Sequence, residues 1–409
     1  MKPIIFIPGI EATNLVDSNK FGFTTVWNAY DTLGTSIKTS ILGAHLDESL
    51  QEDPLYDVTP EVIIERDSIA RLPYEKTIIN LKNKLVEAGN NDPIYLFGYD
   101  WRMSNAENGK RLKLFTEYLK LKLLKNGGVE NFQFLTHSMG GLIFCAYVKL
   151  LENYDEIGKV ILAAPPFLGS PYALIHMVKG DGGFKSFLNS IFGQNEDIRK
   201  IVRTFPSIFE LLPMYDSALT YTGTKKALDL IKIDAWQSNV YDDIKQLFVS
   251  RLDRLAAFRW AYLQDLSQLP TNFRQRILIL AGTMDKTPTY LQVDPVKNNV
   301  KNFIRLDLIK EGMESGDGTV PEVSATCFKD SIQTIGVIKE NLLEELGNNV
   351  DFHGFFLRDS RVQNIIQRYF ASEPNATDNA NERFLYSSKV EGIWKNFADS
   401  TEDLSKFSR

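Results

Sequence analysis

Short apolar runs recur along the chain at intervals that leave room for helices. The runs with the length and composition of buried strands lie at 3–7, 94–97, 132–135, 160–164, 277–281, 303–309 and 332–338. Segments with helical spacing of apolar residues lie between the first four of them, at 74–88, 110–126 and 142–151. Because strands that alternate with helices form parallel sheets covered by helices, the pattern predicts an α/β fold with a mostly parallel central sheet.

Residues 172–270 interrupt this alternation. They contain a glycine-rich segment at 180–183, an apolar stretch from Phe205 to Pro213, and helical spacing near 224–232 and 240–267. This composition predicts a helical cap inserted into the sheet fold. The stretch from Phe205 to Leu212 could line an apolar substrate pocket or pack the cap on itself, and we leave both interpretations open.

The remaining segments complete the predicted domain organisation. Residues 1–171 and 271–370 would form one α/β core, which is ordinary for a chain of 409 residues. Residues 20–72 look like an irregular excursion from the core, either a lid or a packed surface loop. Residues 371–409 begin polar and turn-rich, which predicts a peripheral C-terminal tail.

Composition excludes several classes of function. The 46 basic and 52 acidic residues give a net charge of -6, and no basic run suggests a nucleic-acid partner. Cys145 and Cys327 are the two cysteines of the chain, so we expect no disulfide framework, no metal site and no cofactor. The first residues enter a strand at once and no run of 18 apolar residues follows, which predicts a cytoplasmic protein without a membrane span. The oligomeric state is open.

Ser138 lies in a turn between the run at 132–135 and the helical segment at 142–151. Such a strand, turn and helix form the nucleophile elbow, in which small residues flank the serine two positions away on each side. Gly140 satisfies this rule, while Thr136 replaces the usual glycine. The turn would lift the hydroxyl above the sheet and direct the first amides of the helix toward a developing oxyanion. We therefore favour a nucleophile over a plain glycine-rich turn.

The strand at 3–7 ends in Pro8-Gly9 and delivers the next residues to the same edge of the sheet. Ligands bind at this carboxyl edge in open α/β sheets. The backbone amide of Ile10 or Glu11 could therefore join that of Met139 as an oxyanion donor. Taken alone, this segment would be an ordinary turn.

A serine nucleophile needs a base, and the sequence has four histidines. His137 adjoins Ser138 but lies on the far side of the turn, His45 lies in the excursion, and His176 begins the cap. His353 follows the last strands and fits the chain order serine, acid, histidine. It is the predicted base.

Asp317 is the best candidate for the acid, because Gly316 and Gly318 would let its backbone approach the site closely. A solvated turn is the alternative interpretation, since Asp-Gly is a common turn pair. The fallback acids are Asp307, Glu314 and Asp330.

The strand at 94–97 is followed by Tyr99-Asp100-Trp101-Arg102, which brings an acid, a base and two aromatic rings to the ligand edge. We expect Asp100 and Arg102 to pair and, with Trp101, to support the site, because a paired carboxylate is a poor proton acceptor.

The chain resembles the lecithin:cholesterol acyltransferase family, which includes lysosomal phospholipase and phospholipid:diacylglycerol acyltransferase. The matching stretches are Pro8-Gly9, 99–102, 136–141, 165–170, 205–213, 316–320 and His353. The resemblance implies an α/β-hydrolase fold, a triad of Ser138, Asp317 and His353, and oxyanion amides at Glu11 and Met139. The secreted members have a signal peptide and a disulfide-closed lid, and we expect neither in this protein.

The predicted activity is serine-dependent hydrolysis or O-acyl transfer acting on phospholipid or another lipid ester through an acyl-enzyme. A cap can expose an apolar face without a membrane span, so transient contact with a membrane surface is compatible with the sequence. We keep two alternatives: a generic small-ester hydrolase, and a lipid- or protein-binding module of the same fold in which the triad is unused.

Overall fold

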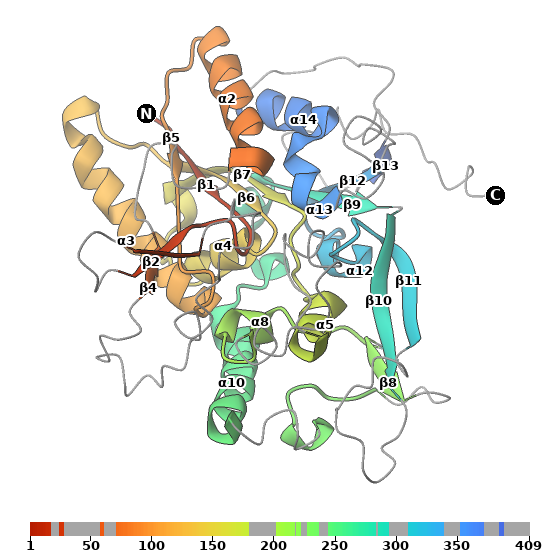
Figure 1. The fold of residues 1–409 in the computed structure, drawn as a ribbon. Helices are drawn as coiled ribbons and strands as arrows, with labels where there is room; N and C mark the ends of the chain where they lie inside the picture. The colour runs from red at the N-terminus through yellow and green to blue at the C-terminus, as the bar shows by residue number, and fades with distance from the viewer. Residues whose placement is uncertain are drawn as a thin grey trace.

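The computed structural model describes residues 1–17, 24–27, 58–60, 71–179, 202–216, 218–221, 227–236, 244–283, 285–293, 310–338, 352–371 and 384–387. Its centre is a seven-stranded sheet with the order β13-β12-β9-β7-β6-β1-β5 (Figure 1). The bounds are β1 Ile4–Ile7, β5 Ile94–Leu96, β6 Phe132–His137, β7 Ile157–Ala163, β9 Ile277–Thr283, β12 Gln333–Ile338 and β13 Phe384–Ser387. The first six are parallel to one another, and β13 is antiparallel to β12.

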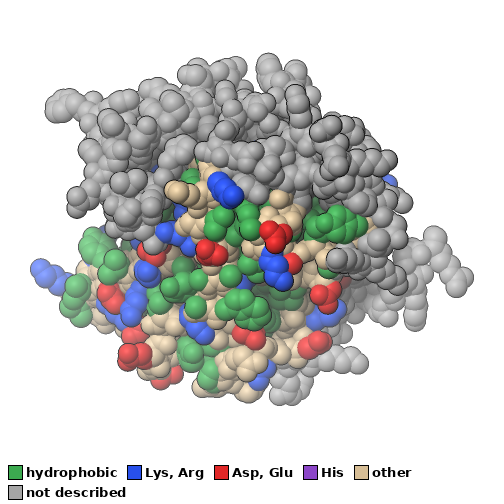
Figure 2. Space-filling model, turned by 90° about the horizontal axis from the view of Figure 1, so that it is seen from below, with side chains coloured by type: hydrophobic (Ala, Val, Ile, Leu, Met, Phe, Trp, Pro, Cys, Tyr) green, Lys and Arg blue, Asp and Glu red, His purple; other side chains and the backbone are tan. Residues whose placement is uncertain are grey.

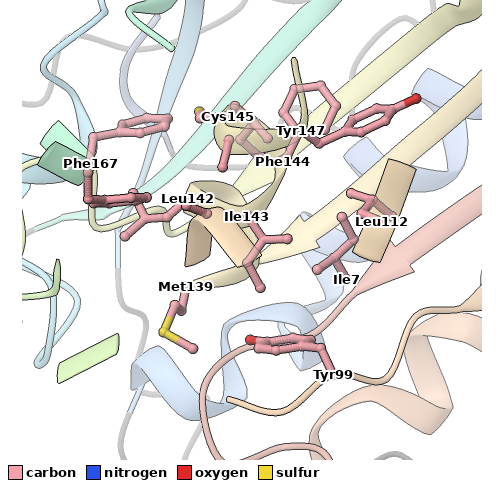
Figure 3. Close-up of a cluster of buried hydrophobic side chains, with 14 of the residues drawn as sticks. Ile7, Tyr99, Leu112, Met139, Leu142, Ile143, Phe144, Cys145, Tyr147 and Phe167 are labelled. Atoms are coloured by element: carbon pink, nitrogen blue, oxygen red, sulfur yellow. The ribbon is translucent and has the colours of Figure 1, made fainter. Parts of the chain in front are cut away.

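Helices cover both faces of this sheet. On one face, α2 (Arg71–Glu87) and α14 (Ser360–Ala371) pack on a core that includes Ile4 and Phe6 of β1. On the other face, α3 (Asn105–Leu123) and α4 (Gly140–Val148) pack on a core that includes Ile5 and Ile7. Side chains of a strand alternate between faces, so both faces of β1 are apolar because both are covered. Figure 3 shows the second core around α4.

This architecture is the α/β-hydrolase fold, which the sequence predicted. Between β7 and β9, the described residues include the helices α5 (Pro171–Lys179), α8 (Pro206–Glu210), α10 (Lys245–Ala257), the π-helix η7 (Phe258–Tyr262) and α11 (Thr271–Arg274). Shorter elements are η3 Leu124–Asn126, η4 Tyr154–Glu156, η5 Ile233–Ala235, η8 Leu266–Gln268, α12 Glu322–Ala325, α13 Phe352–Phe355 and η10 Phe356–Arg358. The division into core, cap and tail stays a prediction.

Two smaller sheets were not predicted. One has the order β11-β10-β8, with bounds Lys310–Gly316, Asp285–Val293 and Leu219–Tyr221. The other joins β2 (Leu15–Asp17) to β3 (Thr24–Trp27) and β4 (Val58–Pro60), so the segment expected to be irregular contributes two strands. The strand expected at 303–309 lies outside the described residues, and β11 begins at Lys310.

The helix expected near 224–232 was wrong for the part that the structure describes. Ala227 instead forms an isolated bridge with Thr220. The Asp229 carboxylate accepts a hydrogen bond from the Ile231 N–H at 3.2 Å, which offers the backbone an alternative to a helix. Strand β13, which lies in the range predicted as a peripheral tail, adds an edge strand to the central sheet.

The surface of the described residues carries both apolar and charged side chains. Seen from below, apolar side chains lie among charged ones of both signs (Figure 2). A search of the described helices finds no segment with the length and apolarity needed to cross a membrane.

Candidate active site

Ser138 lies in the turn between β6 and α4 and is 6% exposed. Its φ of 51° is in the left-handed region, which costs a non-glycine residue energy. The chain after it passes close to β1, since a Cβ on Gly140 would lie 2.5 Å from the Ile7 carbonyl oxygen. Gly140 is therefore required sterically. The strand, turn and helix lie where the sequence predicted a nucleophile elbow, with Thr136 fully buried at the position where glycine is usual.

His353 connects Ser138 to Asp317. Its Nε2 lies 2.8 Å from Ser138 Oγ, and its Nδ1 lies 2.7 Å from Asp317 Oδ2. The histidine is 7% exposed and the aspartate 1%. These residues come from three separate places in the sequence, and the fold brings their side chains together at the carboxyl edge of the sheet. The arrangement can move a proton from the serine hydroxyl to an imidazole that a carboxylate orients.

The Asp317 carboxylate is held by its own loop. Oδ1 accepts hydrogen bonds from the Thr319 and Val320 N–H groups at 3.0 and 2.7 Å, which leaves Oδ2 for His353. Gly318 has a φ of 97°, and its N–H donates to Thr287 Oγ1 at 2.8 Å. The small second sheet thus contributes Thr287 of β10 to the placement of the acid.

Sequence reasoning missed Gly282 on β9. A Cβ at this position would lie 2.4 Å from the Cβ of Asp317, so the acid's loop crosses β9 where there is no side chain. An isolated glycine in an apolar strand can mark such a close approach, and that signal was present in the sequence. Of the fallback acids, Glu314 and Asp330 are exposed, and Asp307 lies outside the described residues.

The loop after β1 lies beside Ser138. Glu11 has a φ of 63°, again in the left-handed region. Two aromatic residues anchor the loop: the Tyr99 hydroxyl donates to the Pro8 carbonyl at 2.9 Å, and Trp101 Nε1 donates to the Thr13 carbonyl at 3.1 Å. Met139 immediately precedes α4, where backbone N–H groups have no partner within the helix. Amides at Ile10, Glu11 and Met139 remain the predicted oxyanion donors.

Asp100 and Arg102 form a two-point ion pair that is buried. Arg102 Nε donates to Asp100 Oδ1 at 2.9 Å, and Nη2 donates to Oδ2 at 2.6 Å. The backbone of the same turn is tied to its neighbours, because Asn108 Nδ2 donates to the Asp100 carbonyl and the Ser207 N–H of α8 donates to that of Arg102. The pair therefore braces the turn between β5 and α3.

The other histidines are not in the same position as His353. His137 points toward α2 and the His353 backbone, with Nδ1 2.9 Å from the Tyr74 hydroxyl. Burial and the nearby His353 hold the pKa of His137 well below its usual value. His176 is half-buried on α5, and desolvation lowers its pKa to about 4. His45 lies outside the described residues. Tyr74 was missed, since its place in an amphipathic helix predicts only a core residue.

Within the described ranges, no cluster of three or more histidine, cysteine or acidic side chains could hold a metal ion. The stretch from Phe205 to Leu212 packs in the core: Phe205 meets the Trp101 ring edge-on at 5.6 Å, and Phe209 meets Phe248 at 5.0 Å between ring centroids. Whether it also lines a substrate pocket stays a prediction.

Comparisons with known proteins give one family and several related folds. A family model described as lecithin:cholesterol acyltransferase matches residues 69–270. A search of curated proteins found no match. The crystal structure of the Tle4–Tli4 complex contains a similar chain, with a TM-score of 0.65, 15% identity, and coverage of 91% of this chain and 98% of that one. At this identity the likeness shows a shared fold.

Two further structures match with lower TM-scores. The Bacillus licheniformis lipase BlEst2 in mature form matches at a TM-score of 0.29 and 12% identity, covering 69% of this chain and 65% of that one. Phospholipase PlaB from Legionella pneumophila matches at a TM-score of 0.32 and 11% identity, covering 91% of this chain and 59% of that one.

Proposed function

We propose that this protein, which belongs to the lecithin:cholesterol acyltransferase family, cleaves the acyl ester of a phospholipid or related lipid with Ser138 as nucleophile. The observation that supports this proposal most strongly is the position of His353, whose two ring nitrogens lie 2.8 Å from Ser138 Oγ and 2.7 Å from Asp317 Oδ2. The family match supports the lipid substrate and the class of reaction, which is hydrolysis or acyl transfer.

In the first step, Ser138 Oγ attacks the ester carbonyl carbon while His353 Nε2 takes the hydroxyl proton. Asp317 accepts the Nδ1–H bond, which fixes the tautomer and stabilises the imidazolium that forms. The oxyanion receives hydrogen bonds from the amides of Met139 and of Glu11 or Ile10. His353 then returns the proton to the leaving alcohol, and the acyl group stays on the serine as an ester.

In the second step, His353 removes a proton from water or from an alcohol, whose oxygen attacks the acyl-serine. The bond between the acyl carbon and Ser138 Oγ then breaks, and His353 returns its proton to Ser138 Oγ. Water as acceptor gives a free fatty acid, and an alcohol gives a new ester. We expect hydrolysis to dominate, because water is always present and an alcohol must be bound.

A protein that acts on phospholipid must meet a lipid surface. Trp260 is 82% exposed and Tyr262 is 42% exposed, and such aromatic rings suit the boundary between water and acyl chains. We expect transient contact with a membrane surface, measurable as sedimentation of the wild-type protein with phospholipid vesicles and weakened by Trp260→Ser.

The central test uses phospholipid liposomes with a labelled acyl chain, with and without a long-chain alcohol. Wild type, Ser138→Ala and Ser207→Ala are compared. Ser207 is also buried, and its Oγ has no hydrogen-bond partner among the described residues, so this variant controls for the loss of a buried hydroxyl. The expected result is free fatty acid from wild type and Ser207→Ala and none from Ser138→Ala.

The same proteins are treated with a fluorophosphonate, which labels an activated serine irrespective of the lipid. Labelling of Ser138 without lipid cleavage would keep the serine hydrolase and reject the lipid substrate, which favours the small-ester alternative. Failure of both assays would favour the binding module.

A further inference from the structure

A chain of hydrogen bonds runs beneath the proposed nucleophile from the loop after β1 to the backbone of His353. The Gly9 N–H donates to the Tyr74 hydroxyl oxygen at 3.3 Å. That hydroxyl lies 2.9 Å from His137 Nδ1, and His137 Nε2 lies 3.0 Å from the His353 carbonyl oxygen. Four segments far apart in the sequence thus meet through two side chains.

The end groups determine the direction of every bond. A carbonyl oxygen can only accept, so His137 carries its proton on Nε2 and donates to His353. Nδ1 is then unprotonated and accepts from the Tyr74 hydroxyl, whose oxygen is in turn free to accept from the Gly9 N–H. Every donor in this series of hydrogen bonds faces the same direction, from Gly9 toward His353. The low pKa of His137 keeps the imidazole in this neutral form.

The surroundings leave this network little freedom to move. Tyr74 is 5% exposed and His137 is 2% exposed. A Cβ on Gly9 would lie 3.1 Å from Ser138 Cβ, 3.3 Å from His137 Nδ1 and 3.4 Å from the Tyr74 hydroxyl, so the loop is seated directly on all three. The rings of His137 and His353 are 5.1 Å apart between centroids.

We propose that Tyr74 and His137 are positioning residues, which hold the loop after β1 and the backbone of His353 at a fixed spacing across Ser138. The inference rests on the proposed function, in which that loop supplies an oxyanion amide and His353 is the base. Both groups must reach the same ester carbonyl, one at its oxygen and the other beside the attacking hydroxyl. A network that spans the loop after β1 and His353 fixes their separation without contacting the substrate.

The test compares variants by the rate of fluorophosphonate labelling of Ser138 and by kcat and KM on a p-nitrophenyl ester. Tyr74→Phe keeps the ring and removes the hydroxyl at the centre of the chain. We expect kcat and the labelling rate to fall about tenfold with little change in KM, because misplacement of reacting groups lowers the rate rather than binding. Tyr369→Phe is the matched control: this tyrosine is 1% exposed and donates to the Arg276 carbonyl at 2.6 Å, away from the site.

Two substitutions of His137 test the hydrogen bond that it donates to the His353 carbonyl oxygen. In His137→Gln, the side-chain amide can still donate near the Nε2 position, whereas His137→Leu has no donor. We expect the glutamine variant to retain more of the labelling rate than the leucine variant.

If the fluorophosphonate labels wild type, and Tyr74→Phe and Tyr369→Phe react at equal rates, the positioning role is overturned. This comparison does not depend on whether His137→Leu folds. A wild type that no fluorophosphonate labels would refute the proposed function and the inference with it.

Discussion

Glu210 is a buried carboxyl whose titration should make the protein less stable as the pH rises from 5 to 8. It ends helix α8, is 1% exposed, and faces the first residues of α3. Ser104 Oγ donates to Oε1 at 2.5 Å, and the Asn105 N–H and Nδ2 donate to Oε2 at 2.7 and 2.8 Å. Burial nevertheless raises the pKa of Glu210 from 4.5 to about 7, against these donors and the charge of Arg259.

The sign of the effect follows from proton binding. Between pH 4.5 and about 7, the folded protein keeps a proton that the unfolded chain loses. The stability associated with protonated Glu210 is therefore fully present below pH 4.5 and is lost as the pH rises through about 7. At 1.36 kcal/mol for each pH unit of the difference, the free energy of unfolding should fall by up to about 3 kcal/mol across this range.

Glu210→Gln replaces the protonated carboxyl by an amide of the same shape. Its Oε1 can accept from both Asn105 donors, and its Nε2 can donate to Ser104 Oγ, whose hydroxyl rotates freely. We expect the variant to match wild type near pH 5 and to be more stable than wild type at pH 8 by up to about 3 kcal/mol.

The assay is urea unfolding at pH 5, 6, 7 and 8, analysed as the difference between variant and wild type so that all other titrating groups cancel. Ser207→Ala, on the same helix, controls for a buried change without charge and should give one constant difference. A Glu210→Gln difference that stays within about 0.5 kcal/mol from pH 5 to 8 would refute the reasoning, since the donors would then outweigh burial.

Three further substitutions test the site and its support. Asp317→Asn should lower kcat about 10⁴-fold on a p-nitrophenyl ester with a small change in KM, because an amide favours the wrong tautomer of His353. Gly282→Ala should cost about 100-fold in kcat/KM, since its methyl group would occupy the space 2.4 Å from the Asp317 Cβ. Arg102→Leu should reduce the free energy of urea unfolding by about 3–5 kcal/mol, because Asp100 would be left buried without its partner.

The six parallel strands of the central sheet could be predicted because they are buried on both faces. Such strands are continuous apolar runs, which a sequence displays directly. The turn that carries Ser138 was equally visible, since one short segment carries the strand, the serine, Gly140 and the helix. His353 and Asp317 required a different kind of reasoning, namely the exclusion of other histidines and a search for an acid with glycine neighbours.

The sheet of β8, β10 and β11 could not be predicted, because β10 lacks the sequence pattern of a strand. Strand β10 is largely polar and contains Pro288, and a proline argues against a strand. The structure accommodates it at an irregularity in the pairing with β11, between Pro288 and Tyr290. Thr287 on this strand holds the loop of Asp317, so an element without a sequence signal supports a residue that has one.

Tyr74 and Glu210 had no local signal, since each has its partners in distant parts of the chain. Tyr74 meets His137 across 63 residues, and Glu210 meets Asn105 across 105. Helical spacing marks Tyr74 as a residue of a helix, and Glu210 stands in the apolar stretch from Phe205 to Pro213, but neither pattern reveals which polar group the residue meets. Contacts of this kind depend on how the elements are placed relative to one another, which the pattern of a single segment does not encode.

Backbone strain in the structure points to the proposed site independently of these side chains. Among the described residues, positive φ values occur in three residues other than glycine: Glu11 at 63°, Ser138 at 51° and Ala164 at 50°. They follow β1, β6 and β7, which are neighbours in the sheet, so all three lie at its carboxyl edge. Strained residues persist where the surrounding packing holds them, and they cluster at functional sites. The same edge carries His353 and Asp317, so the backbone and the side chains point to one location for the chemistry.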